Sequence, residues 1–212
     1  MDDVLKSIYE GVVNGNAPSV GKNIDAALAA GVKAEKILKE GLIAGMAEVG
    51  ARFERNEFFV PEMLIAARAM QMGMNKLKSL LVASGVKPLG KVGIGTVKGD
   101  LHDIGKNLVS MMLEGAGFEV VDMGVDVSPA KFVDGAKNGI QVIAMSALLT
   151  TTMPGMKTTI EALKEAGVRS GVKVMIGGAP VTQAYADQIG ADGYAPDASS
   201  AARLAKKLLG AE

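Results

Sequence analysis

The sequence of 212 residues contains no cysteine, no tryptophan and a single histidine, His102. Without cysteine, the chain has no disulfide, no thiolate zinc site, no Cys-ligated iron–sulfur cluster and no cysteine nucleophile. One histidine also excludes every site that needs two imidazoles, including the helical H-E-x-x-H zinc motif. Any histidine chemistry in this protein must therefore use His102.

The chain also lacks an excess of charge of either sign, because 23 basic residues balance 23 acidic ones. A neutral chain creates no field that attracts nucleic acid or an anionic membrane, and we expect neither as a partner. The start, MDDVLKSIYEG, lacks the basic and apolar segments of a signal peptide, which predicts a cytoplasmic protein. The charge-free stretch 138–156 contains Gln141, hydroxyl residues and Pro154, so it predicts a buried strand rather than a membrane span.

The first part of the chain, residues 1–87, predicts a helical domain of four helices joined by short loops. Apolar residues recur at spacings of three and four, as at Val20, Ile24 and Ala27, and strand patterns are missing. Pro18 is placed to open a helix, because the first turn of a helix tolerates proline. The sequence therefore predicts an N-terminal four-helix bundle.

The second part, residues 88–212, predicts an α/β domain that follows a linker rich in glycine and proline at 84–90. Short apolar runs alternate here with helical segments, and five such units indicate a parallel sheet covered on both faces. The expected strands are Lys91–Val97, Phe118–Met123, Ile140–Ser146, Val172–Ile176 and Gly193–Ala195. The expected helices are 104–116, 129–138, 155–166, 180–189 and 198–209. Ligands of such sheets bind outside the carboxyl ends of the strands.

The loop after the first expected strand contains the pattern Asp100-x-His102-x-x-Gly105. A histidine that binds a metal through one ring nitrogen usually donates the other N–H to a carboxylate, and Asp100 is spaced to accept it. Two phosphate motifs fail in this loop: Lys98 replaces a glycine of the dinucleotide fingerprint, and Asp100 replaces the first glycine of a Walker A loop. The alternative is that His102 is a surface histidine beside Asp103, which would cap the next helix.

Two further loops at strand ends carry candidate ligand-binding residues. Hydroxyl residues from Ser146 to Thr152 follow the third strand and can donate to a carboxylate or to an amide-bearing ligand. Gly177 and Gly178 follow the fourth strand and allow a ligand to lie against the backbone. The alternatives are that Thr152 or a neighbour only caps the next helix and that the glycines form an ordinary turn.

The order and separation of three motifs in the α/β part resemble the cobalamin-binding module: Asp100-x-His102-x-x-Gly105, Ser146-x-Leu148 and Gly177-Gly178. Two motifs of the helical part resemble the cap that precedes this module in methionine synthase: Gly45-Met46-x-x-Val49-Gly50-x-x-Phe53 and Glu57-x-Phe59-x-Pro61-Glu62-Met63-Leu64. The chain is most similar to the free-standing corrinoid proteins that serve methanol, methylamine, betaine and O-demethylase methyltransferases, which share the run Asp103-Ile104-Gly105-Lys106-Asn107. The resemblance implies a helical cap followed by a flavodoxin-like (Rossmann-like) domain.

The resemblance implies that the protein binds cobalamin or a related corrinoid, with His102 as the lower axial ligand of the cobalt. Asp100 would accept a hydrogen bond from the other ring nitrogen, and Ser146 would continue this relay. The resemblance assigns further residues of the α/β part to corrinoid binding: Leu101, Asp103, Ile104, Gly105, Leu148, Thr150, Gly177, Gly178, Ala179, Asp192, Gly193 and Tyr194.

Three residues of the helical part, Glu57, Phe59 and Met63, are expected beside the upper face of the corrin. Methionine suits such a position because it packs adaptably over irregular surfaces, although these side chains would equally serve as bundle core. One position departs from the cap motif: Asn56 stands where glycine is frequent before Glu57, which predicts a tighter or differently bent turn.

The function implied by the resemblance is that of a methyl carrier, which is not an enzyme on its own. It would accept a methyl group on Co(I) (cob(I)alamin) from a substrate-specific methyltransferase. A second methyltransferase would then transfer the methyl group from the methyl-Co(III) state (methylcobalamin) to tetrahydrofolate or coenzyme M. A reductive activase is expected as a further partner. The alternatives are a cobalamin-dependent sensor and the small subunit of an adenosylcobalamin mutase. Sensors normally carry an added DNA-binding or signalling domain, and the mutase module lacks the helical cap.

Overall fold

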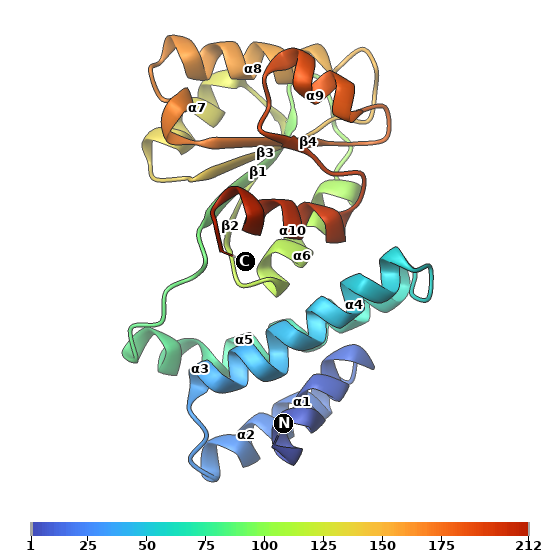
Figure 1. Ribbon diagram of the computed structural model, residues 1–212, viewed down its shortest axis with the longest axis vertical. Helices are drawn as coiled ribbons and strands as arrows, with labels where there is room; N and C mark the ends of the chain where they lie inside the picture. The colour runs from blue at the N-terminus through green and yellow to red at the C-terminus, as the bar shows by residue number, and fades with distance from the viewer. Residues whose placement is uncertain (1, 212) are drawn as a thin grey trace. The chain divides into compact units, whose positions relative to one another are not determined.

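The computed structural model describes residues 2–211, which form two compact units. The first unit consists of the residues up to Lys87 together with Gly115–Gly117, and the second of Pro88–Glu114 and the residues from Phe118 on. Figure 1 shows a helical first unit and, in the second, a sheet with helices on both faces. The predicted fold class, a helical part followed by a parallel α/β part, is confirmed.

The helical unit contains four helical segments, as the sequence predicts. Its elements are α1 (Asp3–Val13), α2 (Ala17–Ala29), a continuous run of α3 (Ala34–Lys36), the π-helix η1 (Ile37–Ile43) and α4 (Ala44–Glu54), and then α5 (Val60–Ala83). Pro18 and Pro61 lie in the first turns of α2 and α5, where the missing N–H costs no intrahelical hydrogen bond. The apolar stripe of these helices forms a fully buried core that includes Leu5, Ile24 and Leu42.

The turn between α4 and α5 contains Asn56, the residue that departs from the cap motif. Its φ angle is 58°, in the left-handed region that asparagine enters more readily than most residues with a side chain. Glycine also adopts this conformation without strain. Replacing the glycine of the motif by Asn56 therefore does not require a different turn.

The second unit contains a parallel sheet in the order β2-β1-β3-β4-β5. Its strands are β1 (Lys91–Val97), β2 (Glu119–Val127), β3 (Val142–Ser146), β4 (Lys173–Gly177) and β5 (Gly193–Tyr194). Its helices are α6 (Ile104–Gly115), α7 (Pro129–Lys137), α8 (Pro154–Glu165), α9 (Gln183–Ile189) and α10 (Ala198–Leu208), with a short 3-10 turn η2 (Arg169–Gly171). The chain changes direction across the sheet between β1 and β3, and ligands of open α/β sheets bind at such a switch point.

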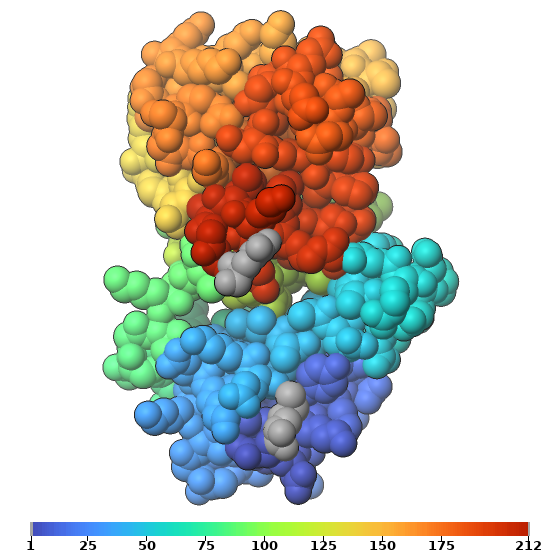
Figure 2. All heavy atoms as spheres, viewed as in Figure 1, coloured from blue at the N-terminus to red at the C-terminus, as the bar shows by residue number. Residues whose placement is uncertain are grey.

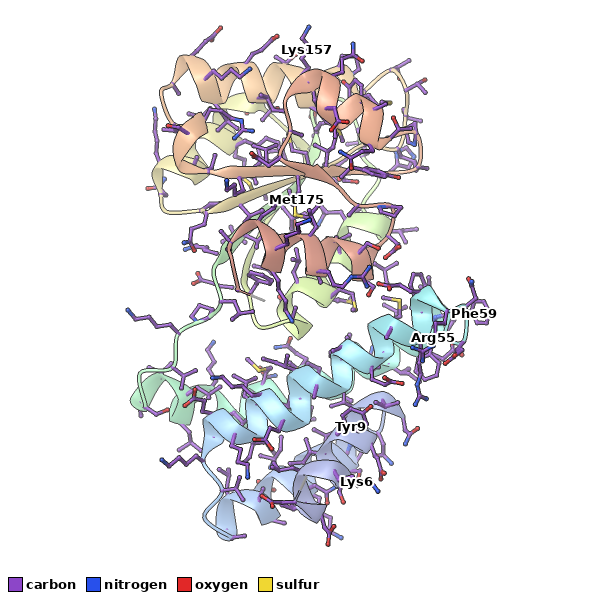
Figure 3. The ribbon with its side chains drawn as sticks, viewed as in Figure 1. Lys6, Tyr9, Arg55, Phe59, Lys157 and Met175 are labelled. Carbon is purple, nitrogen blue, oxygen red and sulfur yellow. The ribbon has the colours of Figure 1, made fainter. Side chains whose placement is uncertain are left out.

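Helices cover both faces of this sheet. In Figure 1, α7, α8 and α9 lie on one face and α6 and α10 on the other. Helices α8 and α9 are in contact and form a continuous orange-to-red surface in Figure 2. Figure 3 shows Lys157 pointing outward from α8, whereas Met175 of β4 is buried against the sheet. This double cover explains why the strands are apolar almost without interruption.

Strand β3 lies within the charge-free stretch 138–156, which confirms that the stretch forms a buried strand. In the part of the chain that the structure describes, no helix has the length and apolar character needed to cross a membrane.

Strand β2 is longer than the sequence predicts and ends at Val127 rather than at Met123. Its pairing with β1 shifts twice: Ile94 pairs with Asp122, Gly95 with Gly124, and Val97 with Val127. Each shift leaves one extra residue on β2, which is the signature of a bulge. The polar residues of this segment break the apolar run, so the run alone does not reveal the end of the strand.

Gly178 allows the loops after β3 and β4 to approach each other closely. Its φ angle is 127°, and a Cβ atom at this position would overlap the carbonyl oxygen of Ala147. The N–H of Ala147 donates to the carbonyl oxygen of Gly177 over 3.3 Å, which holds the two loops together. Only glycine fits both the conformation and the space.

We expect Gly178→Ala to lower the free energy of unfolding by about 2 kcal/mol or more, from backbone strain and overpacking. Urea unfolding measures this loss. Gly171→Ala is the matched control, because a Cβ there meets no atom within 4 Å and its φ is not positive. The control should change stability by less than about 0.5 kcal/mol. Equal losses in the two variants would contradict the packing of the two loops.

Candidate functional site

A tight turn directly after β1 positions the first site residue. The N–H of Asp100 donates to the carbonyl oxygen of Val97 over 3.1 Å, and Gly99 at the third position has a φ of 84°. A positive φ at this position is what a type II turn requires, hence the glycine. The turn directs the side chain of Asp100 toward the loop that follows the neighbouring strand, β3.

The carboxylate of Asp100 is fully buried and accepts hydrogen bonds from two loops. Its Oδ1 lies 2.6 Å from Nδ1 of His102 and 3.1 Å from the backbone nitrogen of His102. Its Oδ2 accepts from the N–H of Leu148 over 2.8 Å and from the hydroxyl of Thr152 over 2.7 Å. Asp100 therefore joins the loop after β1 to the loop after β3.

These contacts fix the charge of Asp100. Burial alone would raise the pKa of this carboxyl, because burial disfavours the charged form. Hydrogen bonds from the Thr152 hydroxyl, the Leu148 N–H and His102 outweigh burial and hold the pKa of Asp100 well below its ordinary value of 3.8. Asp100 is thus an anion near neutral pH and accepts hydrogen bonds without donating any.

The charge of Asp100 determines the tautomer of His102. Since Oδ1 of Asp100 carries no proton, the short contact requires the proton on Nδ1 of His102, which leaves the lone pair on Nε2. The side chain of His102 is 50% exposed, and its backbone carbonyl accepts a hydrogen bond from the buried hydroxyl of Thr96 over 2.8 Å. The imidazole is therefore held in place with one nitrogen available to a metal.

The third member of this relay is Thr152, which corrects the prediction that Ser146 continues it. Ser146 ends β3, and none of the described hydrogen bonds of Asp100 comes from its hydroxyl. Thr152 lies at the other end of the same loop and is turned toward Asp100. The Thr152 hydroxyl is also 2.9 Å from the carbonyl oxygen of Leu149, but its single proton favours the charged acceptor.

The sequence predicts that the hydroxyl residues from Ser146 to Thr152 can donate to a carboxylate or cap the next helix, but it does not single out Thr152. A usable signal was present, because Thr152 is the last hydroxyl before α8 begins at Pro154. A further contact holds this end of the loop: the hydroxyl of Tyr185 in α9 donates to the carbonyl oxygen of Met153 over 2.8 Å. Burial raises the pKa of Tyr185, so this donor keeps its proton.

Large apolar side chains lie on the surface on both sides of His102 in the sequence. Leu101 is 72% and Ile104 is 76% exposed, and Leu148 and Leu149 are also exposed. A Cβ atom at Gly105 would meet no atom within 4 Å, so this side of the loop is open. Exposed apolar residues grouped around a polar centre are typical of a ligand-binding surface.

The other predicted residues of this edge follow β3 and β4. Ser146 is paired with Gly177 in the sheet, and Leu148, Thr150, Gly178 and Ala179 lie in the loops that follow. Asp103 precedes α6 and accepts a hydrogen bond from the side chain of Asn107 over 3.2 Å. The structure thus brings the three motifs of the α/β unit to one edge of the sheet.

Asp192, which is predicted to contact the ligand, lies beside Val174 of β4 and makes contacts within the fold. It directly precedes β5, where its carboxylate accepts from the N–H of Val174 over 2.6 Å and pairs with Arg169 over 2.8 Å. These contacts hold the beginning of a strand that comprises only Gly193 and Tyr194. Asp192 therefore has a role in the fold, and its contact with the ligand stays a prediction.

The three predicted residues of the helical unit differ in their surroundings. Glu57 is held by Arg55 through two hydrogen bonds of 2.8 and 3.0 Å. Phe59 is 60% exposed and lies beside Arg55 at the turn between α4 and α5 (Figure 3). Met63 is buried, which agrees with the alternative that it is bundle core.

The residues around His102 fit a corrinoid better than a metal ion held by the protein alone. Among residues 2–211, no group of three or more His, Asp or Glu side chains could hold a metal ion. A metal at Nε2 of His102 must therefore bring its remaining ligands, as a metal bound in a macrocycle does. The exposed apolar side chains beside His102 suit the face of such a ring.

Comparisons with known proteins identify the family of this chain. The B12 binding domain matches residues 90–203, and a second B12 binding domain family matches residues 4–78. The dimethylamine corrinoid protein 3 of Methanosarcina acetivorans is 47% identical over 99% of this chain and 98% of its own length. The trimethylamine corrinoid protein 1 of the same organism is 43% identical over 98% of each chain.

Solved structures of cobalamin-binding proteins are also similar to this chain. A cobalamin-binding protein from Desulfitobacterium hafniense is 32% identical, with a TM-score of 0.81 over 96% of this chain and 98% of its own. The methanol:cobalamin methyltransferase complex MtaBC from Methanosarcina barkeri contains a chain that is 28% identical, with a TM-score of 0.87 over 100% of this chain and 81% of its own. With both of its units matched and relatives aligned along its whole length, the chain belongs to the family of corrinoid proteins built from B12-binding domains.

Proposed function

We propose that this protein is a methyl carrier that receives a methyl group from a substrate-specific methyltransferase and delivers it to a second methyltransferase. When bound, the corrinoid supplies a cobalt centre that takes up the methyl group and releases it again. The observation that supports the proposal is the geometry of His102, whose Nδ1 is fixed by the buried Asp100 and whose ring is half exposed.

The comparisons support methylated amines as the source of the methyl group. Relatives that align along the whole chain are named as dimethylamine and trimethylamine corrinoid proteins. The complex MtaBC pairs a similar chain with a methyltransferase, which supports a partner of that class. We propose tetrahydrofolate or coenzyme M as the final acceptor and a reductive activase as a further partner. Because the reduced cobalt requires a strong reductant, the cytoplasm is the proposed compartment.

The residues around His102 control one proton. The anionic Asp100 keeps the proton on Nδ1, which makes Nε2 a stronger ligand. The hydroxyl of Thr152 stabilises the carboxylate of Asp100. Asp100 and Thr152 would thus hold the proton at Nδ1 of His102 and leave Nε2 as the donor to a bound corrinoid.

The names of the curated relatives favour a methyl carrier over the two alternatives, a cobalamin-dependent sensor and the small subunit of a mutase. A sensor or the small subunit of a mutase would use the same α/β module, but the curated relatives that match over nearly the whole length are named as corrinoid proteins of methylated amines.

A methyl-transfer assay tests the proposal directly. The protein is loaded with cobalamin, reduced, and mixed with dimethylamine and a dimethylamine methyltransferase. We expect loss of the cob(I)alamin absorption only when both the amine and the methyltransferase are present. A His102→Ala variant, which lacks the axial donor, should react more slowly. If no methylated amine and no matching methyltransferase methylates the bound cobalamin, the proposal is wrong.

Thr152→Val removes the hydroxyl while preserving the shape of the side chain. Because a hydrogen bond to a charged group contributes about 1.5–3 kcal/mol, we expect the free energy of unfolding of the corrinoid-free protein to fall by that amount near pH 7. Because the pKa of Asp100 is lowered in the folded protein, this stabilisation is fully present when the pH lies above the ordinary pKa of an aspartate. It is lost as the pH falls below that value and Asp100 becomes protonated. The difference between the proteins should therefore shrink in acid.

Urea unfolding of both proteins between neutral and acid pH measures this difference. Thr151→Val is the matched control, because Thr151 is exposed and its side chain makes no hydrogen bond among the described residues. A loss that is equal in both variants, or that does not diminish in acid, would contradict the role of Thr152.

A further inference from the structure

The end of β2 holds the turn that carries Asp100. The N–H of Gly99 donates to Oδ1 of Asp126 over 2.7 Å, and the N–H of Asp126 donates to the backbone carbonyl of Asp100 over 3.0 Å. Asp126 therefore contacts both ends of the dipeptide Gly99–Asp100. One contact uses its side chain and the other its backbone.

The path of β2 places Asp126 at this position. The second register shift against β1 adds one residue to β2 between Gly124, which pairs with Gly95, and Val127, which pairs with Val97. A bulge of this kind redirects a side chain out of the regular alternation of a strand. Asp126 has a φ of 51° and is, with Asn56, one of two non-glycine residues with positive φ in the described chain.

A positive φ costs free energy for any residue with a side chain, although aspartate tolerates it better than most. The surroundings must therefore favour this conformation. The two hydrogen bonds to Gly99–Asp100 are the contacts that do so.

Asp100 is consequently held from two directions. The loop after β3 holds Oδ2 of its carboxylate through Leu148 and Thr152, whereas Asp126 holds its backbone. Gly99 is the flexible position in this turn, because glycine adopts many backbone conformations. Without the acceptor on Asp126, the Lys98–Gly99 peptide has one restraint fewer, and the position of Oδ1 of Asp100 beside Nδ1 of His102 is less firmly fixed.

We infer that Asp126 is a positioning residue for the histidine that binds cobalt. It acts through the Gly99–Asp100 backbone and does not touch His102. The inference rests on the proposed role of His102 as the axial ligand. It predicts that the strength of the bond between His102 and cobalt depends on the side-chain oxygen acceptor that Asp126 provides from another strand.

Two variants separate the hydrogen bond of Asp126 from its backbone strain. Asp126→Gly removes the acceptor and relieves the strain, whereas Asp126→Asn keeps an oxygen acceptor and tolerates the positive φ. Asn56→Gly is the control, because it relieves the same backbone conformation in the helical unit. Each protein is loaded with cobalamin, and the pH at which half of the histidine ligand is lost is measured from the cobalamin absorption.

Acid releases the histidine by protonating Nε2, so a weaker bond to cobalt is lost at higher pH. We expect Asp126→Gly to weaken ligation about tenfold, as loss of a hydrogen-bonding partner behind a metal ligand typically does. Tenfold corresponds to an upward shift of the midpoint by about one pH unit. Asp126→Asn and Asn56→Gly should remain close to the wild type, and thermal unfolding should show that Asp126→Gly is folded.

A midpoint in Asp126→Gly equal to that of the wild type, with the protein folded, would overturn the inference and leave the role of His102 intact. If the wild-type protein itself shows no histidine ligation, both the proposed axial ligand and the inference are wrong. A second measurement needs no variant: amide hydrogen exchange of Gly99 in the wild-type holoprotein. The N–H should be protected, and exchange at the rate of a free amide would also overturn the inference.

Discussion

The buried carboxylate of Asp100 is the interaction on which the site depends. A buried anion is costly unless hydrogen bonds compensate it, and Asp100 receives them from His102, Leu148 and Thr152. These donors come from loops after neighbouring strands, so the carboxylate joins the two sides of the switch point of the sheet. Its negative charge in turn fixes the proton of His102 on Nδ1. The joining of the two loops, the tautomer of His102 and the available ring nitrogen are thus consequences of one satisfied buried charge.

This arrangement explains how a chain with one histidine and no cysteine belongs to a family of metal-cofactor proteins. A corrin ring supplies the equatorial ligands of its cobalt, so the protein needs to add a single axial donor. What the protein adds is control of that donor, through the charge and the hydrogen bonds behind it. The scarcity of ligating side chains is therefore compatible with the site, and it leaves His102 as the proposed axial ligand.

The fold could be predicted from the sequence because it follows from local patterns. The helical spacing of residues such as Ile24 and the apolar runs such as β3 reflect which faces are buried, and the structure confirms both parts. The end of β2, the role of Thr152 and the position of Asp192 could not be predicted in this way. Each depends on the path of a bulge or loop, and therefore on hydrogen bonds between residues far apart in the sequence.

The most direct test of this account is electron paramagnetic resonance of the Co(II) state in cobalamin-loaded protein labelled with ¹⁵N-histidine. Since His102 is the only histidine, the label marks one residue of the protein. The account predicts that the nitrogen splitting of the cobalt signal changes with the label, because Nε2 of His102 binds the metal. A nitrogen splitting that is the same in labelled and unlabelled protein would show that the axial ligand is not His102 and would contradict the account.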